Sequence, residues 1–212
     1  MSETIRIARK LRSGARAFFA DAKGLAAIEL ALILPMMLML MSLVVFGGQA
    51  YGVQRRVTLS ATTVANIFAQ ANDVNTSTIT AAELNQILAY PNLILYPYDG
   101  STAAVVVSQL LVTVNPNGTA TGTVGTCPAT LNPSAPCSWA NANGVPLQIG
   151  TQLSIDPSIA SAFPPGSTGN YVILGEVQYP FQPTGIWFSV GSFTLHDSII
   201  MIPRVASPIT VQ

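Results

Sequence analysis

One carboxylate, Glu29, stands directly before the longest apolar run of the chain. Leu25 lies four residues earlier and follows Gly24. If the peptide bond after Gly24 were cut, Leu25 would carry a new α-amino group, and a helix would place that amine and Glu29 on one face. An acid in the first turn also complements the helix dipole. In a helical bundle the two charges would pair with those of a neighbouring copy, whereas the alternative is a hydrated carboxylate at headgroup depth.

The remaining polar side chains form no catalytic or metal-binding pattern. His196 and Asp197 are adjacent, and adjacent residues of a strand point to opposite faces. The sequence contains no nucleophile elbow, zinc-protease motif, phosphate loop or dinucleotide fingerprint. Scattered carboxylates without metal-ligand spacing complete the set: Asp73, Glu83, Asp99, Asp156 and Glu176. We therefore expect no enzymatic activity, no cofactor, no metal and no small-molecule substrate, and we expect His196 to be an ordinary, partly exposed histidine.

Two cysteines, Cys127 and Cys137, lie in a segment rich in Pro, Asn and Ser. A zinc site would need closer ligand spacing and a nearby histidine. Cysteines outside the cytoplasm usually pair, and a disulfide closing a loop of this size stabilises the fold by about 3 kcal/mol in the chain-entropy model. A disulfide is the prediction, and two free thiols are the alternative.

Charge is scarce and unevenly distributed along the chain. Of the 212 residues 8% are charged, whereas a soluble domain has about 25%. The nine basic and nine acidic residues balance, but most cations lie in residues 1–24, and Arg204 is the only cation from residue 57 onward. The surface of that later region must therefore consist largely of Thr, Ser, Asn and Gln, which suits side-by-side assembly or adhesion, or else adaptation to a harsh exterior.

The run Leu30–Phe46 separates the basic segment from the later region. It carries no charge, and Ser42 is its only hydroxyl residue. With the apolar residues on either side it reaches the roughly 20 residues that one membrane crossing needs. A basic flank stays in the cytoplasm, so we expect a single span with the N-terminus inside and the C-terminal region outside. Pro35 falls within the span and is expected to kink it.

Three other interpretations of the apolar run and its basic flank do not involve a membrane span. It could be a buried core helix, although six neighbouring cations argue against that. It could be a cleaved signal peptide, with Gly47–Ala50 as the nearest small residues, although it is longer than the usual apolar region of about 7–15 residues. The cations could form a nucleic-acid arm, but topology explains their position better, and we expect no nucleic-acid partner.

The segment from Gly24 to Pro35, Gly-Leu-Ala-Ala-Ile-Glu-Leu-Ala-Leu-Ile-Leu-Pro, follows a basic leader and is followed by Phe46-Gly47 and Gln54–Val57. This arrangement resembles the TadE-like family, the minor pilins (pseudopilins) of the tight-adherence type IV-like pilus system, over about residues 23–70. The resemblance implies cleavage between Gly24 and Leu25 by a prepilin peptidase, an aspartic protease of the inner membrane, and gives Glu29 the acidic role that follows that site.

Two points qualify what the resemblance implies. Leu30 follows the Glu, where this group usually has Phe or Tyr. The related TadG-like proteins share the anchor but often keep it uncleaved, so an uncut, membrane-tethered protein is the alternative. The end of the chain, residues 171–204, is more loosely similar to the closing strands of both groups.

Helical periodicity continues beyond the apolar run. Spacings of three, four and seven form an apolar stripe, and the first helix is expected to span Leu25–Ala71. The stripe consists of Val53, Val57, Val64, Phe68 and Ala71, with Leu59 and Ile67 beside it, and Gln54, Arg56, Thr58, Thr62, Asn66 and Gln70 opposite. Thr80 and Glu83 form a capping box that predicts a short second helix ending at Tyr90-Pro91.

After Pro91 the pattern changes to β-branched and aromatic runs separated by turn residues. We expect strands near Ala103–Val114, Ala120–Val124, Leu147–Ile155, Tyr171–Pro180 and Ile186–Pro203, the last broken at Gly191. Asn115–Gly118 predicts a hairpin turn. Late aromatic residues, including Tyr179, Phe181, Trp187 and Phe193, are expected in the core, with a glycan-binding or surface-binding patch as the alternative.

The expected fold class is α+β: a long transmembrane helix that continues into a pilin-like periplasmic domain with an antiparallel sheet packed on the helix stripe. The expected parts are a basic cytoplasmic leader (1–24), the transmembrane helix (25–50), an extramembrane helical region (51–90) and a β-rich domain (91–212). We expect a structural minor pilin of the bacterial inner membrane that is cleaved after Gly24 and enters the pilus or its initiating complex. Its partners would be membrane lipid, the peptidase, other pilins and the Tad inner-membrane assembly proteins. An uncleaved envelope protein and a pilus-tip adhesin are the alternatives.

Overall fold

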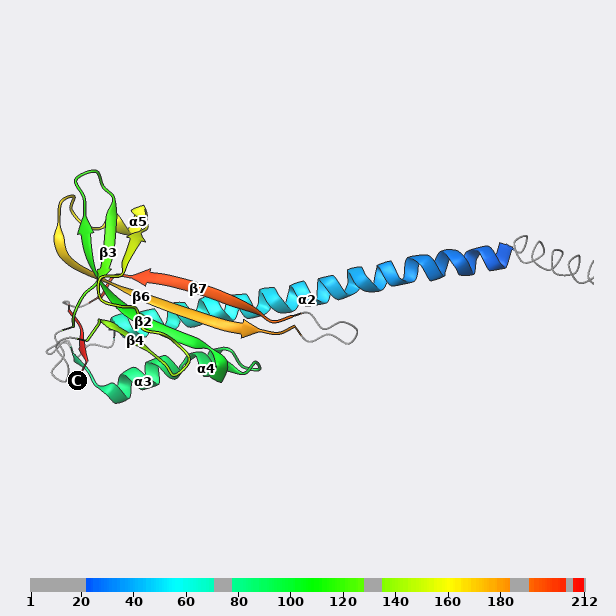
Figure 1. Cartoon of the computed structure of the whole chain (residues 1–212), viewed down its shortest axis with the longest axis horizontal. Helices are drawn as coiled ribbons and strands as arrows, with labels where there is room; N and C mark the ends of the chain where they lie inside the picture. Colours follow the sequence, from blue (N-terminus) through cyan, green and yellow to red (C-terminus); the bar gives the residue numbers. More distant parts are fainter. Residues whose placement is uncertain (1–21, 71–77, 128–134, 184–190, 205–207, 212) are drawn as a thin grey trace, which may run out of the picture. The chain divides into compact units, whose positions relative to one another are not determined.

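The computed structural model of the chain describes residues 22–70, 78–127, 135–183, 191–204 and 208–211 (Figure 1). Most of the expected leader, together with Ala71 and Trp187, lies outside these residues. The chain divides into two compact units, and the boundary between Gln49 and Ala50 falls within the first helix. The second unit therefore contains the expected helical region 51–90 and the described part of the expected β-rich region.

Helix α2 spans Ala22–Gln70 without interruption and includes Pro35. Its described part agrees with the helix predicted from the sequence. Within the apolar run the Ser42 hydroxyl donates a hydrogen bond of 2.8 Å to the carbonyl oxygen of Leu38, one turn earlier. The only hydroxyl of the run is thus satisfied inside the helix, as a lipid environment requires.

The second unit contains an antiparallel sheet with the order β5-β3-β2-β6-β7 and β4 as a further partner of β2. Its strands are β2 (Ala104–Val114), β3 (Ala120–Val124), β4 (Ser138–Ala140), β5 (Gln152–Ile155), β6 (Thr168–Phe181) and β7 (Phe193–Met201). The α+β class with a long helix followed by an antiparallel sheet is therefore confirmed. The hairpin turn is confirmed as well, because Gly118 has φ +85° and β2 pairs with β3.

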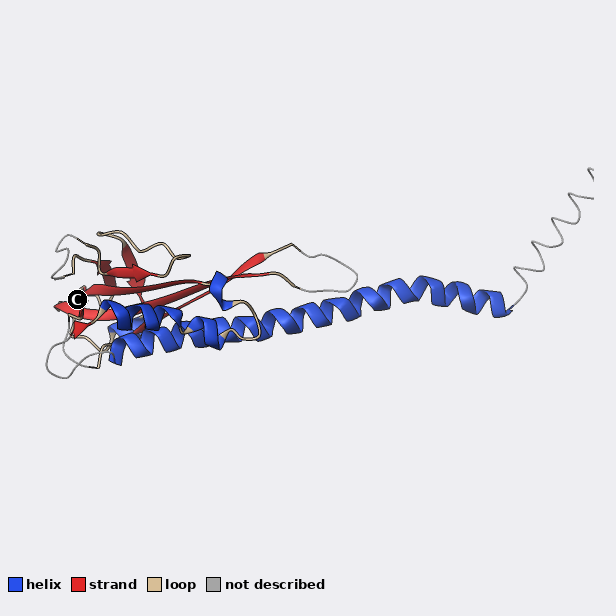
Figure 2. Ribbon diagram, turned by 90° about the horizontal axis from the view of Figure 1, so that it is seen from below, coloured by secondary structure: helices blue, strands red, loops and turns tan. Residues whose placement is uncertain are grey.

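One face of the sheet packs against the end of α2. Figure 2 shows the end of α2 running alongside the strands of the sheet. The core joins the α2 stripe to odd-numbered side chains of β2 and β6: Val53, Val57, Ala61, Val64, Phe68, Val105, Val107, Ile173, Val177, Tyr179 and Phe181. A Cβ added at Gly175 would lie 2.8 Å from the Ala65 Cβ and 3.0 Å from the Ala61 carbonyl oxygen. The helix approaches the sheet closely because β6 has no side chain at this point.

Even-numbered residues of β2 and β6 form a second core on the opposite face. Its members are Leu110, Val112, Val114, Ala120, Val124, Ile155, Ala160, Val172 and Leu174. They are contributed by β2, β3, β5, β6 and the short helix α5 (Pro157–Ala160). The central strand β2 is consequently buried on both faces for most of its length.

Helix α3 (Ala81–Ala89) has the predicted capping box: the Glu83 N–H donates to the Thr80 hydroxyl, and the Thr80 N–H donates to the Glu83 carboxylate. The helix ends at Tyr90, as predicted, and α4 (Pro91–Ile94) follows at once, then η1 (Gly100–Thr102). A pair of short parallel strands, β1 (Thr78–Ile79) and β8 (Thr210–Val211), joins the start of α3 to the end of the chain.

Some local predictions are wrong. The strand expected over Leu147–Ile155 begins only at Gln152, because Gly150 adopts φ +85° in a turn closed by a bond from the Thr151 N–H to the Gln148 carbonyl. Leu59 is exposed, because it lies on the side of α2 opposite the stripe. The last expected strand is described as β7 from Phe193 to Met201, and its first expected residues, 186–190, lie outside the described part.

Candidate functional site

The candidate processing segment lies near the start of α2, in the first unit. The backbone of Gly24 and Leu25 is helical. Glu29 is exposed, one helical turn after Leu25. Within the described part of the chain the Glu29 carboxylate has no hydrogen bond or ion pair. A helical spacing of four brings two side chains within about 5–6 Å at their Cβ atoms, so an amine at Leu25 and the Glu29 carboxylate would lie on one face.

All large apolar side chains from Ile28 to Val45 are exposed. A buried core helix is therefore the wrong explanation for the apolar run, because a core helix would have its apolar side chains covered by the rest of the chain. Among the described residues α2 is the one helix long and apolar enough to cross a membrane. Its place near the N-terminus fits both a membrane span and a signal sequence.

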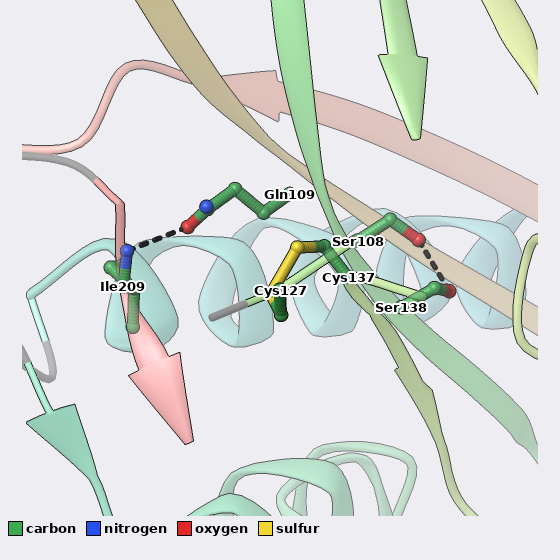
Figure 3. The surroundings of a disulfide bond; sticks show 6 residues. All are labelled: Ser108, Gln109, Cys127, Cys137, Ser138 and Ile209. Carbon is green, nitrogen blue, oxygen red and sulfur yellow. Dashed lines mark hydrogen bonds between the residues drawn. A yellow bond between two sulfur atoms is a disulfide. The ribbon is translucent and has the colours of Figure 1, made fainter. Parts of the chain in front are cut away.

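A disulfide joins Cys127 and Cys137, whose Cα atoms lie 4.9 Å apart, in agreement with the sequence prediction (Figure 3). Both residues are buried. The disulfide closes a loop between β3 and β4, which are antiparallel to β2 and lie one after the other along the same side of it.

The register of these strands shows how the loop is inserted. Val124 of β3 lies opposite Leu110, and Ser138 of β4 lies opposite Ser108. Extending either register by one residue places Gly125 or Cys137 opposite Gln109. The chain between these two residues therefore leaves the sheet and returns to it at the same position. The Cys137 N–H donates to the Gly125 carbonyl (3.0 Å), and the Gln109 N–H donates to the Cys137 carbonyl (2.8 Å). β3 and β4 thus form one interrupted strand, with the disulfide across the base of the insertion.

Three comparisons of the chain, with protein-family models, with curated proteins and with solved structures, find no match.

Buried polar groups surround the disulfide. The Ser108 and Ser138 hydroxyls are hydrogen-bonded to each other at 2.7 Å, and the Ser138 hydroxyl also accepts from the Leu147 N–H. The Gln109 side chain is buried, and its Oε1 accepts a 2.9 Å bond from the N–H of Ile209 (Figure 3). Among the described residues the Gln109 Nε2 has no partner. This buried amide fixes the last described segment of the chain next to the disulfide.

His196 and Asp197 point in different directions, as expected for neighbours in a strand. The His196 Nε2 lies 3.7 Å from the Glu176 carboxylate on one face of the sheet. The Asp197 carboxylate accepts from the Thr58 hydroxyl of α2 on the other face. His196 is exposed, and the two side chains do not form a catalytic pair.

Polar residues of α2 reach the edge strand β7, which the sequence analysis did not anticipate. The Gln54 amide donates to the His196 carbonyl (3.3 Å), and Thr58 binds Asp197. The Ser198 N–H also donates to Asp197 (2.9 Å). Satisfied backbone groups on an edge strand hinder pairing with a further strand. A threonine and a glutamine one turn apart were the available signal, but nothing in the sequence identifies the strand that they meet.

The late aromatic residues are divided between core and surface. Tyr179 and Phe181 are buried, as expected, and Phe193 is partly exposed. Burial raises the pKa of the Tyr179 phenol, so this hydroxyl stays protonated. Trp187 and Phe188 lie outside the described residues, so the alternative of a late aromatic binding patch gains no support from them.

Surface clefts are lined by described residues of the second unit. One, of about 220 Å³, lies over the sheet between Val106, Glu176, Gln178 and the turn around Gly144. Another, of about 310 Å³, is lined by asparagines of α3, α4 and the segment after β4. The described residues contain no group of three or more His, Cys, Asp or Glu side chains that could hold a metal.

Three acidic side chains act as local caps. Hydrogen bonds from Thr80 lower the pKa of Glu83. Hydrogen bonds from Ser101 lower the pKa of Asp99, and those from Ser158 lower the pKa of Asp156. Each carboxylate is stabilised in its charged form by the turn that it closes, and this capping accounts for its position.

Proposed function

We propose that this protein is a structural subunit, a minor pilin of a tight-adherence type IV-like pilus. In this proposal α2 anchors the chain in the bacterial inner membrane with the N-terminus in the cytoplasm and the second unit in the periplasm. A prepilin peptidase cuts after Gly24, and the released helix then exchanges lipid for the helices of other pilins.

The observation that carries the proposal is the apolar stretch of α2 together with its one carboxylate. The side chains from Ile28 to Val45 are exposed, so they need a covering that the described part of the chain does not supply. Lipid can supply it before assembly and neighbouring helices afterwards. Glu29 would be costly at either place unless it were paired. An α-amino group at Leu25 provides a cation of the right kind at the start of each neighbouring helix.

The composition of the second unit supports an assembly role. From residue 57 onward the sequence has seven charged residues, so the exposed faces repel their neighbours weakly. Polar, uncharged surfaces are compatible with close packing of subunits. The disulfide is consistent with folding outside the cytoplasm.

Processing and assembly can be tested with variants at two positions. Gly24→Val should block cleavage, whereas Gly24→Ala, which adds one methyl group, should retain part of it. Glu29→Gln should leave a cleaved chain that is absent from sheared pili, and Glu29→Asp should restore part of the incorporation. The readouts are the length of the membrane-bound chain and its amount in the sheared fraction.

The alternatives predict different results from the same experiment. An uncleaved envelope protein would keep its full length in the wild type, and Gly24→Val would leave its function unchanged. Normal incorporation of Glu29→Gln into sheared pili would contradict the assigned role of the carboxylate.

A further inference from the structure

Exposed apolar side chains gather at one end of the second unit. Tyr51 on α2 is 75% exposed, Leu93 of α4 and Tyr96 after it are each 74% exposed, and Phe193 at the start of β7 is 41% exposed. We call these four residues the aromatic end. Scattered exposed apolar residues need no explanation, but a group of this kind on a charge-poor domain indicates an interaction surface.

Direct contacts hold the elements of the aromatic end together. The Arg56 guanidinium of α2 donates to the Ile94 carbonyl (3.3 Å) and lies above the Tyr98 ring, 5.9 Å from its centroid. Tyr98 then packs against Phe181 at 6.2 Å, and Phe181 packs against Phe193 at 5.5 Å. The turn of α2 around Arg56, α4, the end of β6 and the start of β7 therefore form one continuous surface.

The position of Tyr51 in the sequence indicates what covers this surface. Tyr51 follows Phe46, the last residue of the apolar run, by five residues on the same helix. At 1.5 Å per residue this is about 7.5 Å along the axis. The hydrocarbon core of a bilayer is about 30 Å thick and the whole bilayer about 40–45 Å, so each headgroup layer is roughly 5–8 Å deep. If the run fills the hydrocarbon core, Tyr51 lies in the headgroup layer.

We propose that the aromatic end binds the headgroup layer of a phospholipid bilayer and seats the second unit on the membrane before assembly. Tyrosine rings are enriched at this depth because an apolar ring and a polar hydroxyl match the two sides of the layer. Arg55 is exposed beside Tyr51 and supplies a cation for lipid phosphate. Within the second unit Arg56, five residues after Tyr51 on α2, donates to the Ile94 carbonyl, so a bilayer surface that meets this unit at Tyr51 would also meet Leu93 and Tyr96. The inference rests on the proposed function, since it requires α2 to span the membrane.

The test uses the full-length chain in phosphatidylcholine–phosphatidylglycerol vesicles, with a fluorophore on the cysteine of a Tyr96→Cys variant. The described part of the chain has no free cysteine, so the new thiol is labelled alone. Nitroxide-labelled lipids, with the nitroxide at the headgroup or deep in the acyl chain, quench emission at their own depth. We expect strong loss of emission with the headgroup nitroxide and little loss with the acyl-chain nitroxide.

Two matched labels separate the possible results. Ile149 is half-exposed and precedes Gly150, whose N–H binds the carbonyl of Val124. Val124 pairs with the second half of β2, whereas the aromatic end lies near its first residue, so a label at Ile149→Cys should not be quenched. A label at Ser42→Cys reports insertion of α2 and should be quenched by the acyl-chain nitroxide.

Quenching of the label at Ser42→Cys but not of the label at Tyr96→Cys would refute headgroup binding by the aromatic end and leave the membrane anchor intact. No quenching at Ser42 would refute the anchor, and with it the proposed function. If the label at Tyr96→Cys escaped headgroup quenching only at a high protein-to-lipid ratio, a second copy of the chain would be the occupant, and the proposal would be overturned. Adding Tyr51→Ser and Leu93→Ser to the labelled variant should abolish its headgroup quenching without unfolding it, because both side chains are exposed.

Discussion

Two stretches of α2 have opposite environments although they belong to one helix. From Ile28 to Val45 apolar side chains occur all round the helix and are exposed. From Val53 to Ala69 they are restricted to one side and are buried under the sheet and α3. The second stretch also uses small residues, Ala61 and Ala65, where the sheet comes closest. The described residues therefore leave the first stretch uncovered, whereas they bury and stabilise the second.

The largest difference should appear when one apolar side chain is truncated in each stretch. Phe68 is fully buried and contacts Trp139, with ring centroids 5.4 Å apart. Phe68→Ala should lower the free energy of unfolding of the second unit by about 3–5 kcal/mol. Leu32→Ala should leave it unchanged, because Leu32 is exposed. Urea unfolding of the full-length chain in detergent, followed by near-ultraviolet circular dichroism, measures both; equal losses would contradict the comparison.

Removal of the disulfide tests the stability of the sheet that covers the second stretch of α2. Replacing Cys127 and Cys137 together by Ser should cost about 3 kcal/mol, because it releases the loop inserted between β3 and β4. Excising residues 126–137 and joining Gly125 to Ser138 keeps the register and removes the loop as well. We expect this shortened chain to retain the β2–β4 pairing and to be more stable than the double-Ser variant in the same unfolding assay. A shortened chain that fails to fold would show that β3 and β4 are not one strand.

Two glycine substitutions should have smaller effects of opposite sign, one in β6 where it packs on the second stretch of α2 and one in α2 just after the first stretch. Gly175→Ala would press a methyl group against Ala61 and Ala65 and should destabilise the second unit by about 1–3 kcal/mol. Gly48→Ala meets no atom within 4 Å and should strengthen the helix by up to about 1 kcal/mol. Thermal unfolding of the two variants provides the measurement, and a neutral Gly175→Ala would argue against close helix–sheet packing.

The smallest effect concerns the acidic cap of α3. Because the pKa of Glu83 is lowered from its ordinary value of 4.5 by hydrogen bonds from Thr80, its contribution to stability is present above pH 4.5. That contribution is lost as pH falls through the lowered pKa. Glu83→Gln should therefore reduce stability at neutral pH and flatten the acid part of the stability curve. Chemical unfolding between pH 3 and 7 tests this. The control is Gln86→Glu, which changes the charge of the same helix at an exposed position outside the capping box.

Local signals in the sequence predicted much of this fold. The capping box at Thr80, the turn at Gly118 and the bounds of β3 follow from residues that lie close together in the chain. The stripe on α2 follows from its period, and the wrong member, Leu59, falls outside that period. The apolar run could be interpreted from length and composition alone.

Features that depend on distant partners were not predicted. Strand β4 has three residues, and the disulfide-closed loop separates it in the sequence from β3, whose line it continues along β2. Strands β1 and β8 have two residues each and form where the segment before α3 meets the last described segment of the chain. The contacts of Gln54 and Thr58 with β7 join residues more than one hundred positions apart, and no periodic pattern encodes such a pairing. At the candidate processing segment the spacing of Gly24, Leu25 and Glu29 is visible in the sequence, but the exposure of the following side chains required the structure.

The most direct test of the account is the N-terminus of the mature chain. The full-length protein would be isolated from the membranes of a cell that contains a prepilin peptidase and analysed by intact-mass and terminal-peptide mass spectrometry. We predict a chain that begins at Leu25, with a free α-amino group four residues before Glu29. A mature chain that still begins at Met1, or that begins after the apolar run, would contradict it.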